Sequence, residues 1–107
     1  MGEAKFDVGL TERAWSDRDA IETYWARRGE EWRGAKYFAD LRKVAESQLA
    51  DPQAARRGRT LRDCDMEGAQ EILAFGVYRI IYEIDEAAAR VDILRSWHAY
   101  RAAPPPE

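Results

Sequence analysis

Residues 70–98 read QEILAFGVYRIIYEIDEAAARVDILRSWH, and this stretch decides the fold class. It is dense in Ile, Val, Tyr and Phe, and two short connectors, at Gly76 and at residues 86–90, divide it into three runs. β-Branched and aromatic residues favour strands, and several such runs joined by short connections are typical of a meander. The sequence therefore predicts three consecutive antiparallel strands in the second half of the chain.

The side chains of the middle run alternate, and in a strand successive side chains point to opposite faces. The residues expected on the core face are Tyr78, Ile80, Tyr82 and Ile84. The other, more open face then carries Arg79, Ile81 and Glu83. In a register without a bulge, the expected pairs with the last strand are Ile84–Val91, Tyr82–Ile93, Tyr78–Trp97 and Arg79–Ser96. This register also places His98 diagonal to Arg79 on the open face.

The first half of the chain predicts one strand and a helical hairpin. Residues 5–10, KFDVGL, alternate between apolar and other residues, as in a strand with one buried face. Thr11 is a suitable N-cap for a helix that ends near Gly29, and a second helix from Glu30 or Glu31 ends at Asp51-Pro52. The apolar stripe of the second helix is Gly34, Tyr37/Phe38, Leu41, Val44/Ala45 and Gln48/Leu49. We therefore expect an α+β fold of order β-α-α-β-β-β, with the helical hairpin packed on an antiparallel sheet.

The chain has the size of a single compact domain. Its 107 residues are 46% apolar, and 4 Trp, 5 Tyr and 3 Phe supply bulky side chains for a core. We expect one domain over residues 1–103 and an extended, solvent-exposed tail over residues 104–107. The tail contains three consecutive prolines, which cannot extend a helix or donate to a strand ladder.

Composition excludes several classes of function. One cysteine and one histidine cannot form a disulfide framework or a structural zinc site, so no metal or other cofactor is expected. The longest apolar run is a few residues, and the N-terminus has no signal pattern, which indicates a cytoplasmic protein without a membrane partner. A net charge of −3 argues against direct, sequence-specific DNA binding by the chain itself.

An ordered set of motifs resembles the RelE/ParE toxin superfamily. In the first helix these are Ala14, Asp17, Ile21 and Tyr24, with Arg18 where an apolar residue is usual. The second helix contributes Ala35, Tyr37, Leu41 and the exit at residues 49–52. The most specific part is Tyr-Arg-Ile-Ile-Tyr at residues 78–82, followed by Val91, Ile93, Leu94, His98 and Arg101. Together the motifs span residues 6–101.

The resemblance implies the toxin of a bacterial type II toxin–antitoxin pair, held inactive by a ParD-like or RelB-like antitoxin. RelE-like members are ribosome-dependent messenger-RNA endonucleases, whereas ParE-like members poison DNA gyrase by binding. RelE-like enzymes carry lysines on the strand before the Tyr-Arg motif, but residues 70–75 contain none, and the last lysine of the chain is Lys43. We therefore favour a ParE-like gyrase inhibitor without catalysis.

Two other hypotheses remain open. A RelE-like endoribonuclease would use Arg79, His98 and Tyr100 as catalytic residues, although a structural role for His98 is favoured. A toxin fold that has lost its toxicity would survive as a module that binds a partner.

Candidate binding residues come from three segments. Trp15 and Trp32 lie off the best helical stripes and are expected at an interface with the antitoxin or target, whereas Trp25 and Phe38 are assigned to the core. The basic run in residues 53–62 supplies Arg56, Arg57, Arg59 and Arg62 as a docking loop, and the near-terminal Arg101 is added to the set. The alternative for this run is a solvated loop neutralised by nearby acids. Cys64 is assigned no role.

Overall fold

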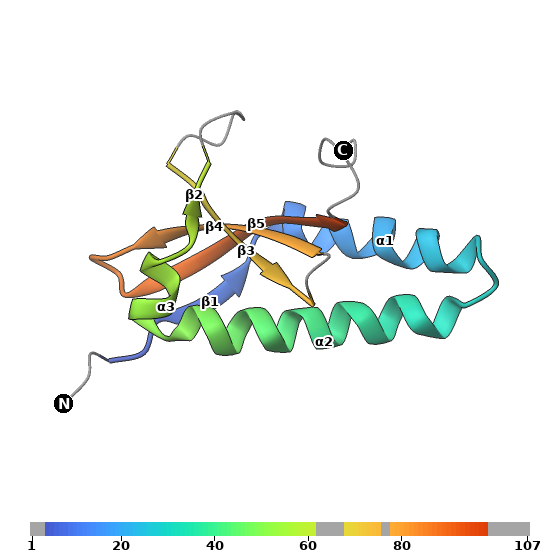
Figure 1. Ribbon diagram of the computed structural model, residues 1–107, viewed down its shortest axis with the longest axis horizontal. Helices are drawn as coiled ribbons and strands as arrows, with labels where there is room; N and C mark the ends of the chain where they lie inside the picture. Colours follow the sequence, from blue (N-terminus) through green and yellow to red (C-terminus); the bar gives the residue numbers. More distant parts are fainter. Residues whose placement is uncertain (1–3, 62–67, 76–77, 99–107) are drawn as a thin grey trace.

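The computed structural model describes residues 4–61, 68–75 and 78–98 of the chain, and for residues 97 and 98 it describes the backbone alone. The elements in chain order are β1 (Asp7–Leu10), α1 (Glu12–Ala26), α2 (Glu31–Ala50), α3 (Pro52–Arg56), β2 (Arg59–Thr60), β3 (Gln70–Ala74), β4 (Tyr78–Asp85) and β5 (Arg90–His98). Figure 1 shows α1 and α2 as a long hairpin that lies against the sheet. The α+β class and the hairpin on a sheet are confirmed.

The sheet has five strands in the order β1-β5-β4-β3-β2. The three-stranded meander β3-β4-β5 is antiparallel, as predicted, but β1 runs parallel to β5, so the sheet is mixed. The short elements α3 and β2 were not anticipated. Both lie in the segment that the sequence indicated only as a basic loop.

The helix ends follow the capping signals. The Thr11 hydroxyl oxygen accepts a hydrogen bond from the N–H of Ala14 at 3.2 Å, and Gly29 closes α1 with a φ of 74° that favours glycine. The Thr11 hydroxyl also lies 3.1 and 3.2 Å from the carbonyl oxygens of Ile93 and Leu94. The N-cap of α1 therefore also joins this helix to β5.

The main core lies between the hairpin and one face of the sheet. From α2 it takes the expected stripe of Gly34, Phe38, Leu41, Ala45 and Leu49, all buried. The strands contribute Tyr78, Ile80, Tyr82, Val91 and Ile93. A Cβ on Gly34 would lie 2.7 Å from the Cα of Glu22, so α1 and α2 approach closely at this point. Glycine at position 34 is what permits this close packing.

A β-bulge shifts the register between β4 and β5. The predicted pairs Ile84–Val91 and Tyr82–Ile93 are present, but the next pair joins Ile81 to Arg95, so that Leu94 is the extra residue. The pairs expected beyond this point were therefore wrong. Tyr78 is opposite His98 and Arg79 is opposite Trp97. This change removes the diagonal relation expected for Arg79 and His98.

The sheet face away from the hairpin, here called the outer face, has a small core of its own. Ile81, expected on a more open face, is fully buried there with Leu61 and Ala69, and Leu94 packs against them. The expectation of an open environment at Ile81 was therefore wrong. The segment that contains α3 and β2 brings Leu61 over this part of the sheet.

Side-chain hydrogen bonds fasten α3 to the sheet. The buried Tyr82 hydroxyl donates to the Ala55 carbonyl oxygen at 2.6 Å. Burial raises the pKa of Tyr82 to about 12, so this hydroxyl stays protonated at neutral pH. The Gln70 side-chain amide donates to carbonyl oxygens of the α3 segment, including that of Gly58 at 3.0 Å. These contacts hold the outer-face segment in place. None of the helices in the described part is long and apolar enough to cross a membrane.

Candidate functional site

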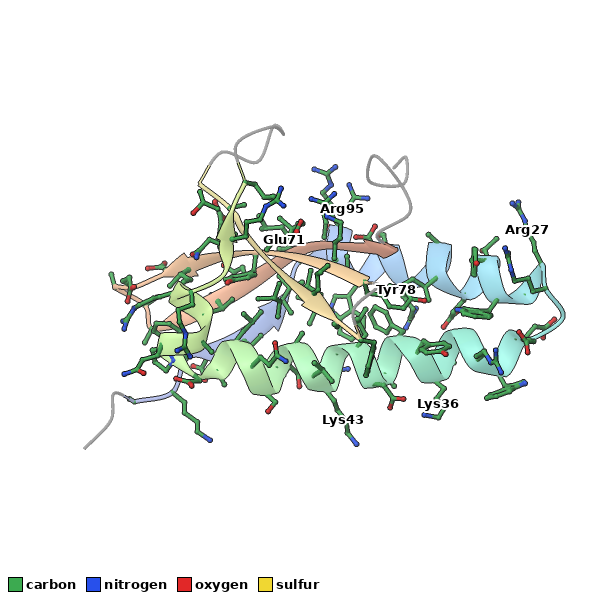
Figure 2. All side chains as sticks on the ribbon, in the orientation of Figure 1. Arg27, Lys36, Lys43, Glu71, Tyr78 and Arg95 are labelled. Carbon is green, nitrogen blue, oxygen red and sulfur yellow. The ribbon has the colours of Figure 1, made fainter. Side chains whose placement is uncertain are left out.

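The outer face brings together the charged residues of the meander. The register aligns Glu71 with Ile81 and Ile81 with Arg95, and it aligns Leu73 with Arg79, so all five positions share this face. In Figure 2 the labelled Glu71 and Arg95 lie on the side of the sheet away from α2. The hairpin fills the opposite face of the sheet, so the outer face carries the candidate site.

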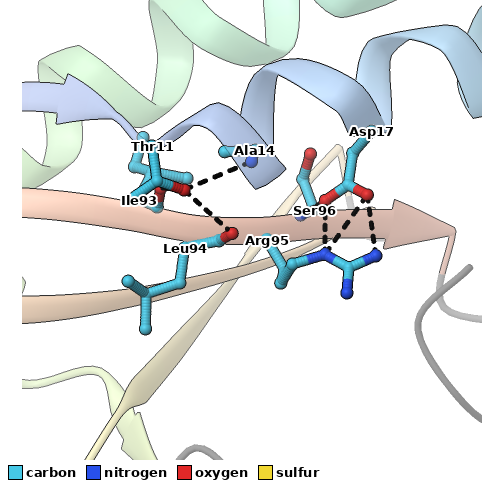
Figure 3. A network of polar contacts seen from close by, with 7 residues as sticks. All are labelled: Thr11, Ala14, Asp17, Ile93, Leu94, Arg95 and Ser96. Carbon is cyan, nitrogen blue, oxygen red and sulfur yellow. Dashed lines mark hydrogen bonds and ion pairs between the residues drawn. The ribbon is translucent and has the colours of Figure 1, made fainter. Parts of the chain in front are cut away.

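Arg95 forms a buried ion pair with Asp17 of α1. The Arg95 Nε lies 2.9 Å from Asp17 Oδ2, and the terminal guanidinium nitrogen Nη2 lies 2.9 Å from Asp17 Oδ1, so the contact is bidentate. Asp17 also accepts the backbone N–H of Ser96 at 2.8 Å (Figure 3). The side chains of Arg95 and Asp17 are only 5% and 3% exposed. This pair joins α1 to β5 at the bulge.

Sequence reasoning missed this pair. In the sequence Asp17 stood out only as a residue of the family motif, and Arg95 was not singled out, although Asp17 lies between Ala14 and Ile21 on the buried side of α1. A charged residue on a stripe that must be buried is itself a signal, because a buried charge requires a partner.

Arg79, the conspicuous arginine of the Tyr-Arg motif, is paired with Glu71 of β3. Its Nε donates to Glu71 Oε2 at 2.6 Å, and a terminal guanidinium nitrogen also contacts this oxygen. The Glu71 side chain is 8% exposed and that of Arg79 is 23% exposed. The charge of Arg79 is therefore countered by an adjacent carboxylate in a place that water reaches poorly.

The three lysines of the chain are far from this arrangement in the fold. Lys36 and Lys43 are on α2 and point away from the sheet in Figure 2. Lys5 precedes β1, an edge strand of the sheet that β5 and β4 separate from β3. In the described part of the chain, the cations nearest Glu71 on the meander are therefore arginines, and β3 itself has no lysine.

Two large apolar side chains are exposed at the end of β3. Leu73 and Phe75 are each 51% exposed. Phe75 has a φ of 54°, a left-handed conformation that is unusual for a bulky residue. Sequence reasoning did not single out either residue. Alternation along QEILA was the available signal, since Ile72 and Ala74 face the core and Leu73 must then face outward.

The two tryptophans predicted at an interface are exposed on the hairpin. Trp32 is 63% exposed and Trp15 is 37% exposed. The Trp15 ring packs against its neighbours: its centroid is 5.8 Å from that of Phe38 and 5.0 Å from the Arg42 guanidinium carbon. Trp32 is therefore the more accessible of the two. Phe38 is buried and Trp25 is partly buried against the core, as assigned.

The basic run does not form one cluster. Arg56 makes a bidentate pair with Glu86, at 2.9 and 2.7 Å. Arg57 and Arg59 are exposed and have no ion-pair partner among the described residues. Arg62 and Cys64 lie outside the described residues. Among the described members of the run, the ion pair with Glu86 thus neutralises Arg56.

The remaining candidates fall at the end of β5. The backbone of His98 is paired with that of Tyr78, and nothing further is described of the His98 side chain. Tyr100 and Arg101 lie outside the described residues. No group of three or more His, Cys, Asp or Glu side chains in the described part could hold a metal ion.

Solved structures with this fold define a class of protein. The toxin–antitoxin complex RelBE2 from Mycobacterium tuberculosis is 25% identical over 94% of this chain and 95% of that chain, with a TM-score of 0.65. The chromosomal ParDE toxin–antitoxin system from P. aeruginosa is 18% identical over 90% and 98%, with a TM-score of 0.67. A YoeB/ParE toxin from Agrobacterium tumefaciens is 18% identical over 89% and 100%, with a TM-score of 0.51. The fold is thus that of RelE/ParE-superfamily toxins.

The sequence supports the assignment independently of the fold. The family described as the ParE toxin of the type II toxin–antitoxin system parDE matches residues 8–103. No curated protein sequence matches the chain. Because the family match covers nearly the whole chain, this protein belongs to the ParE toxin family of type II toxin–antitoxin systems.

Proposed function

We propose that this toxin inhibits DNA gyrase by binding to it and hydrolyses no nucleic acid itself. The observation that carries the proposal is the pairing of Arg79 with Glu71 on a meander without lysine. Cleavage of RNA without a metal needs cations that stabilise a phosphorane and groups that transfer protons. A carboxylate beside the main cation repels phosphate and neutralises that cation. The outer face is therefore better suited to binding a protein than to cleaving RNA.

The partner that neutralises the toxin is proposed to be a cognate antitoxin, ParD-like or RelB-like. The support comes from the RelBE2 and ParDE structures, which are toxin–antitoxin systems. Exposed apolar side chains on the toxin supply suitable anchors for such a partner. Among the described residues the large ones are Trp15, Tyr24, Trp32, Leu73 and Phe75.

The runner-up function is a ribosome-dependent endoribonuclease that uses Arg79, His98 and Tyr100. The observation in its favour is the 25% identity to the toxin–antitoxin complex RelBE2. The two functions differ in target and in chemistry, so one set of assays separates them.

Purified toxin is expected to inhibit supercoiling by gyrase or to trap cleaved DNA, and a His98→Gln variant should retain this inhibition within about twofold. In a ribonuclease, loss of the proton-transfer group should lower the cleavage rate by ~10²-fold or more. The measurements are a gyrase supercoiling assay and a translation-coupled messenger-RNA cleavage assay on the same preparations. Thermal melting of each variant controls for folding.

Codon-dependent cleavage of translated messages, combined with normal gyrase activity, would contradict the proposal. So would a His98→Gln variant that melts like the parent and has lost all toxicity. Either result would place the ribonuclease first.

A Trp32→Ala variant is expected to bind the antitoxin at least about fivefold more weakly, the equivalent of ~1 kcal/mol for an aromatic anchor. Because Trp32 is largely exposed, its removal should leave the melting temperature of the free toxin nearly unchanged. Titration calorimetry of the toxin with its antitoxin measures the affinity. Lys43→Ala, an exposed change on the same helix, is the matched control. Equal affinities for the two variants would show that Trp32 is no anchor.

A further inference from the structure

One edge of the sheet is formed by β1, whose outward side is unpaired in the described part of the chain. β1 stands at the end of the strand order, and β5 is its only described neighbour in the sheet. The backbone N–H groups of Asp7 and Thr11 both donate toward the β5 side, each at 3.0 Å. Because backbone polar groups alternate in direction along a strand, those of Val8 and Leu10 point away from β5. Among the described residues, no group bonds to them on that side.

Gly9 stands between these two residues, and the fold of the single chain does not require glycine there. A Cβ at position 9 would meet no described atom within 4 Å, and the φ of Gly9 is not left-handed. Glycine weakens a strand, and inside a strand it often marks a place where another backbone approaches closely. Gly9 is therefore the residue expected where a second strand lies against β1.

β1 also lacks the residues that usually block pairing at the edge of a sheet. Edge strands are commonly protected by lysine, by proline or by a bulge. β1 reads Asp-Val-Gly-Leu, and its pairing with β5 is regular. The strand at the opposite edge, β2, has only two residues, of which one is the exposed Arg59. The β1 edge is thus the less protected of the two.

The open backbone groups of β1 are self-complementary about Gly9. When a second copy approaches antiparallel with Gly9 opposite Gly9, Val8 of each copy is opposite Leu10 of the other. Each of these pairs exchanges both of its N–H···O=C bonds, and the Gly9 pair is of the close, non-hydrogen-bonded type. This register uses every open group of the edge, because the next outward N–H, that of Phe6, already donates to the Ala50 carbonyl oxygen at 2.8 Å.

The side chains of this edge suit the same arrangement. Val8 and Leu10 are partly buried against the main core, so the pairing places apolar side chains beside apolar ones and covers them further. Asp7, the only charged residue of β1, comes opposite Thr11 of the second copy, so no like charges meet in the ladder. Thr11 is the N-cap of α1, and the positive end of a helix favours a carboxylate nearby.

We propose that two copies of this toxin pair through β1 as an antiparallel dimer with a two-fold axis at Gly9. The pairing joins two five-stranded sheets into one continuous sheet. The two-fold axis of an antiparallel pair is perpendicular to the sheet, so the outer faces of both copies lie on the same side of the dimer. The interface is short, so the dimer forms at high toxin concentration and dissociates on dilution. This inference goes beyond the proposed function and does not depend on the target of the toxin.

Gly9→Lys and Gly9→Glu test the pairing at its axis. Each change places two like charges opposite each other in the dimer, so we expect each variant alone to dissociate with a constant at least about tenfold above that of the parent. Position 9 has room for a side chain in the single chain, so both variants should fold like the parent. Sedimentation velocity of the full-length toxin over a range of concentrations measures the dimer, and circular dichroism checks the fold.

An equimolar mixture of the two Gly9 variants gives the decisive result. A two-fold axis at this position brings Lys opposite Glu in the mixed dimer, so we expect dimers to return with a dissociation constant within about threefold of the parent. The matched controls are Gln53→Lys and Gln53→Glu, which make the same charge changes at an exposed position of α3. Both controls should form dimers like the parent.

Several outcomes would overturn the proposal. One is a parent toxin that stays monomeric at the highest soluble concentration. Another is dimerisation of the separate Gly9 variants as strong as that of the parent, since the interface would then lie elsewhere. A mixture of folded variants that forms no dimers would exclude the axis at Gly9. If the parent is monomeric and the Val8 and Leu10 amides become protected from hydrogen exchange only with the co-purified antitoxin, the edge belongs to the antitoxin.

Discussion

Asp17→Ala is expected to lower the free energy of unfolding by about 3–5 kcal/mol, because it breaks a buried ion pair by removing the carboxylate that binds the Arg95 guanidinium. The Arg95 side chain is 5% exposed, so water cannot take the place of the carboxylate. The change also removes the acceptor of the Ser96 N–H. Urea denaturation followed by circular dichroism measures the loss. A domain of this size has only about 5–15 kcal/mol to lose, so even an unfolded variant agrees with the expectation.

The matched control for Asp17→Ala is Glu86→Ala. It removes the carboxylate from another bidentate arginine pair, that of Arg56, but in this case the pair is exposed to solvent. Exposed ion pairs contribute about 0–1 kcal/mol. If Asp17→Ala costs no more than Glu86→Ala, the buried pair is not a significant source of stability.

Gly58→Ala is expected to cost about 2–4 kcal/mol, from crowding and from a lost buried hydrogen bond together. A Cβ at position 58 would lie 1.7 Å from the Tyr82 hydroxyl oxygen, which bonds the Ala55 carbonyl oxygen at 2.6 Å. The φ of Gly58 is not left-handed, so the penalty comes from the missing space and not from the backbone conformation. Thermal and urea denaturation of the purified variant measure it.

A double-mutant cycle isolates the cause of the Gly58→Ala effect. In a Tyr82→Phe background the clashing oxygen is absent, so Gly58→Ala should cost at least ~1 kcal/mol less than in the parent. Some cost should remain, since the Tyr82 ring carbon that bears the hydroxyl would still be 2.8 Å from the new Cβ. Equal costs in the two backgrounds would contradict contact with Tyr82 as the cause.

The order of β1, α1, α2 and the meander β3-β4-β5 was predictable because each of these elements carries a local signal. The stripe from Gly34 to Leu49, the cap at Thr11 and the stop at Asp51-Pro52 each depend on residues a few positions apart. The alternation in residues 78–82 is equally local. Periodicity and capping report such short-range preferences well, which is why the meander and the hairpin were found.

Long-range features had no comparable signal. The bulge at Leu94 depends on how β4 and β5 fit over the core, and one inserted residue moves every later pair by one position. The Asp17–Arg95 pair joins residues 78 positions apart. The parallel pairing of β1 with β5 also comes from the folded topology, because a strand at the start of the chain gives no indication of its neighbour.

The candidate site was predicted in part. Arg79 was recognised from its motif, but its direct contact with Glu71 follows only from the antiparallel register of β3 and β4. Trp32 is exposed as expected, whereas the role of the basic run and of Trp32 in binding stays a prediction. The exposed Phe75 was missed because its left-handed backbone has no sequence signature in a phenylalanine.

The parallel pair of β1 and β5 has a consequence for synthesis of the toxin. β1 and the N-cap of α1 are made first, yet both bond to β5, whose residues 90–98 are made last. Closing a loop of some eighty residues is slow compared with local folding, so the sheet is completed late. A nascent chain that has not yet reached β5 lacks the strand to which β1 and α1 are joined. We therefore expect the toxin to become active only after nearly all of its residues have left the ribosome.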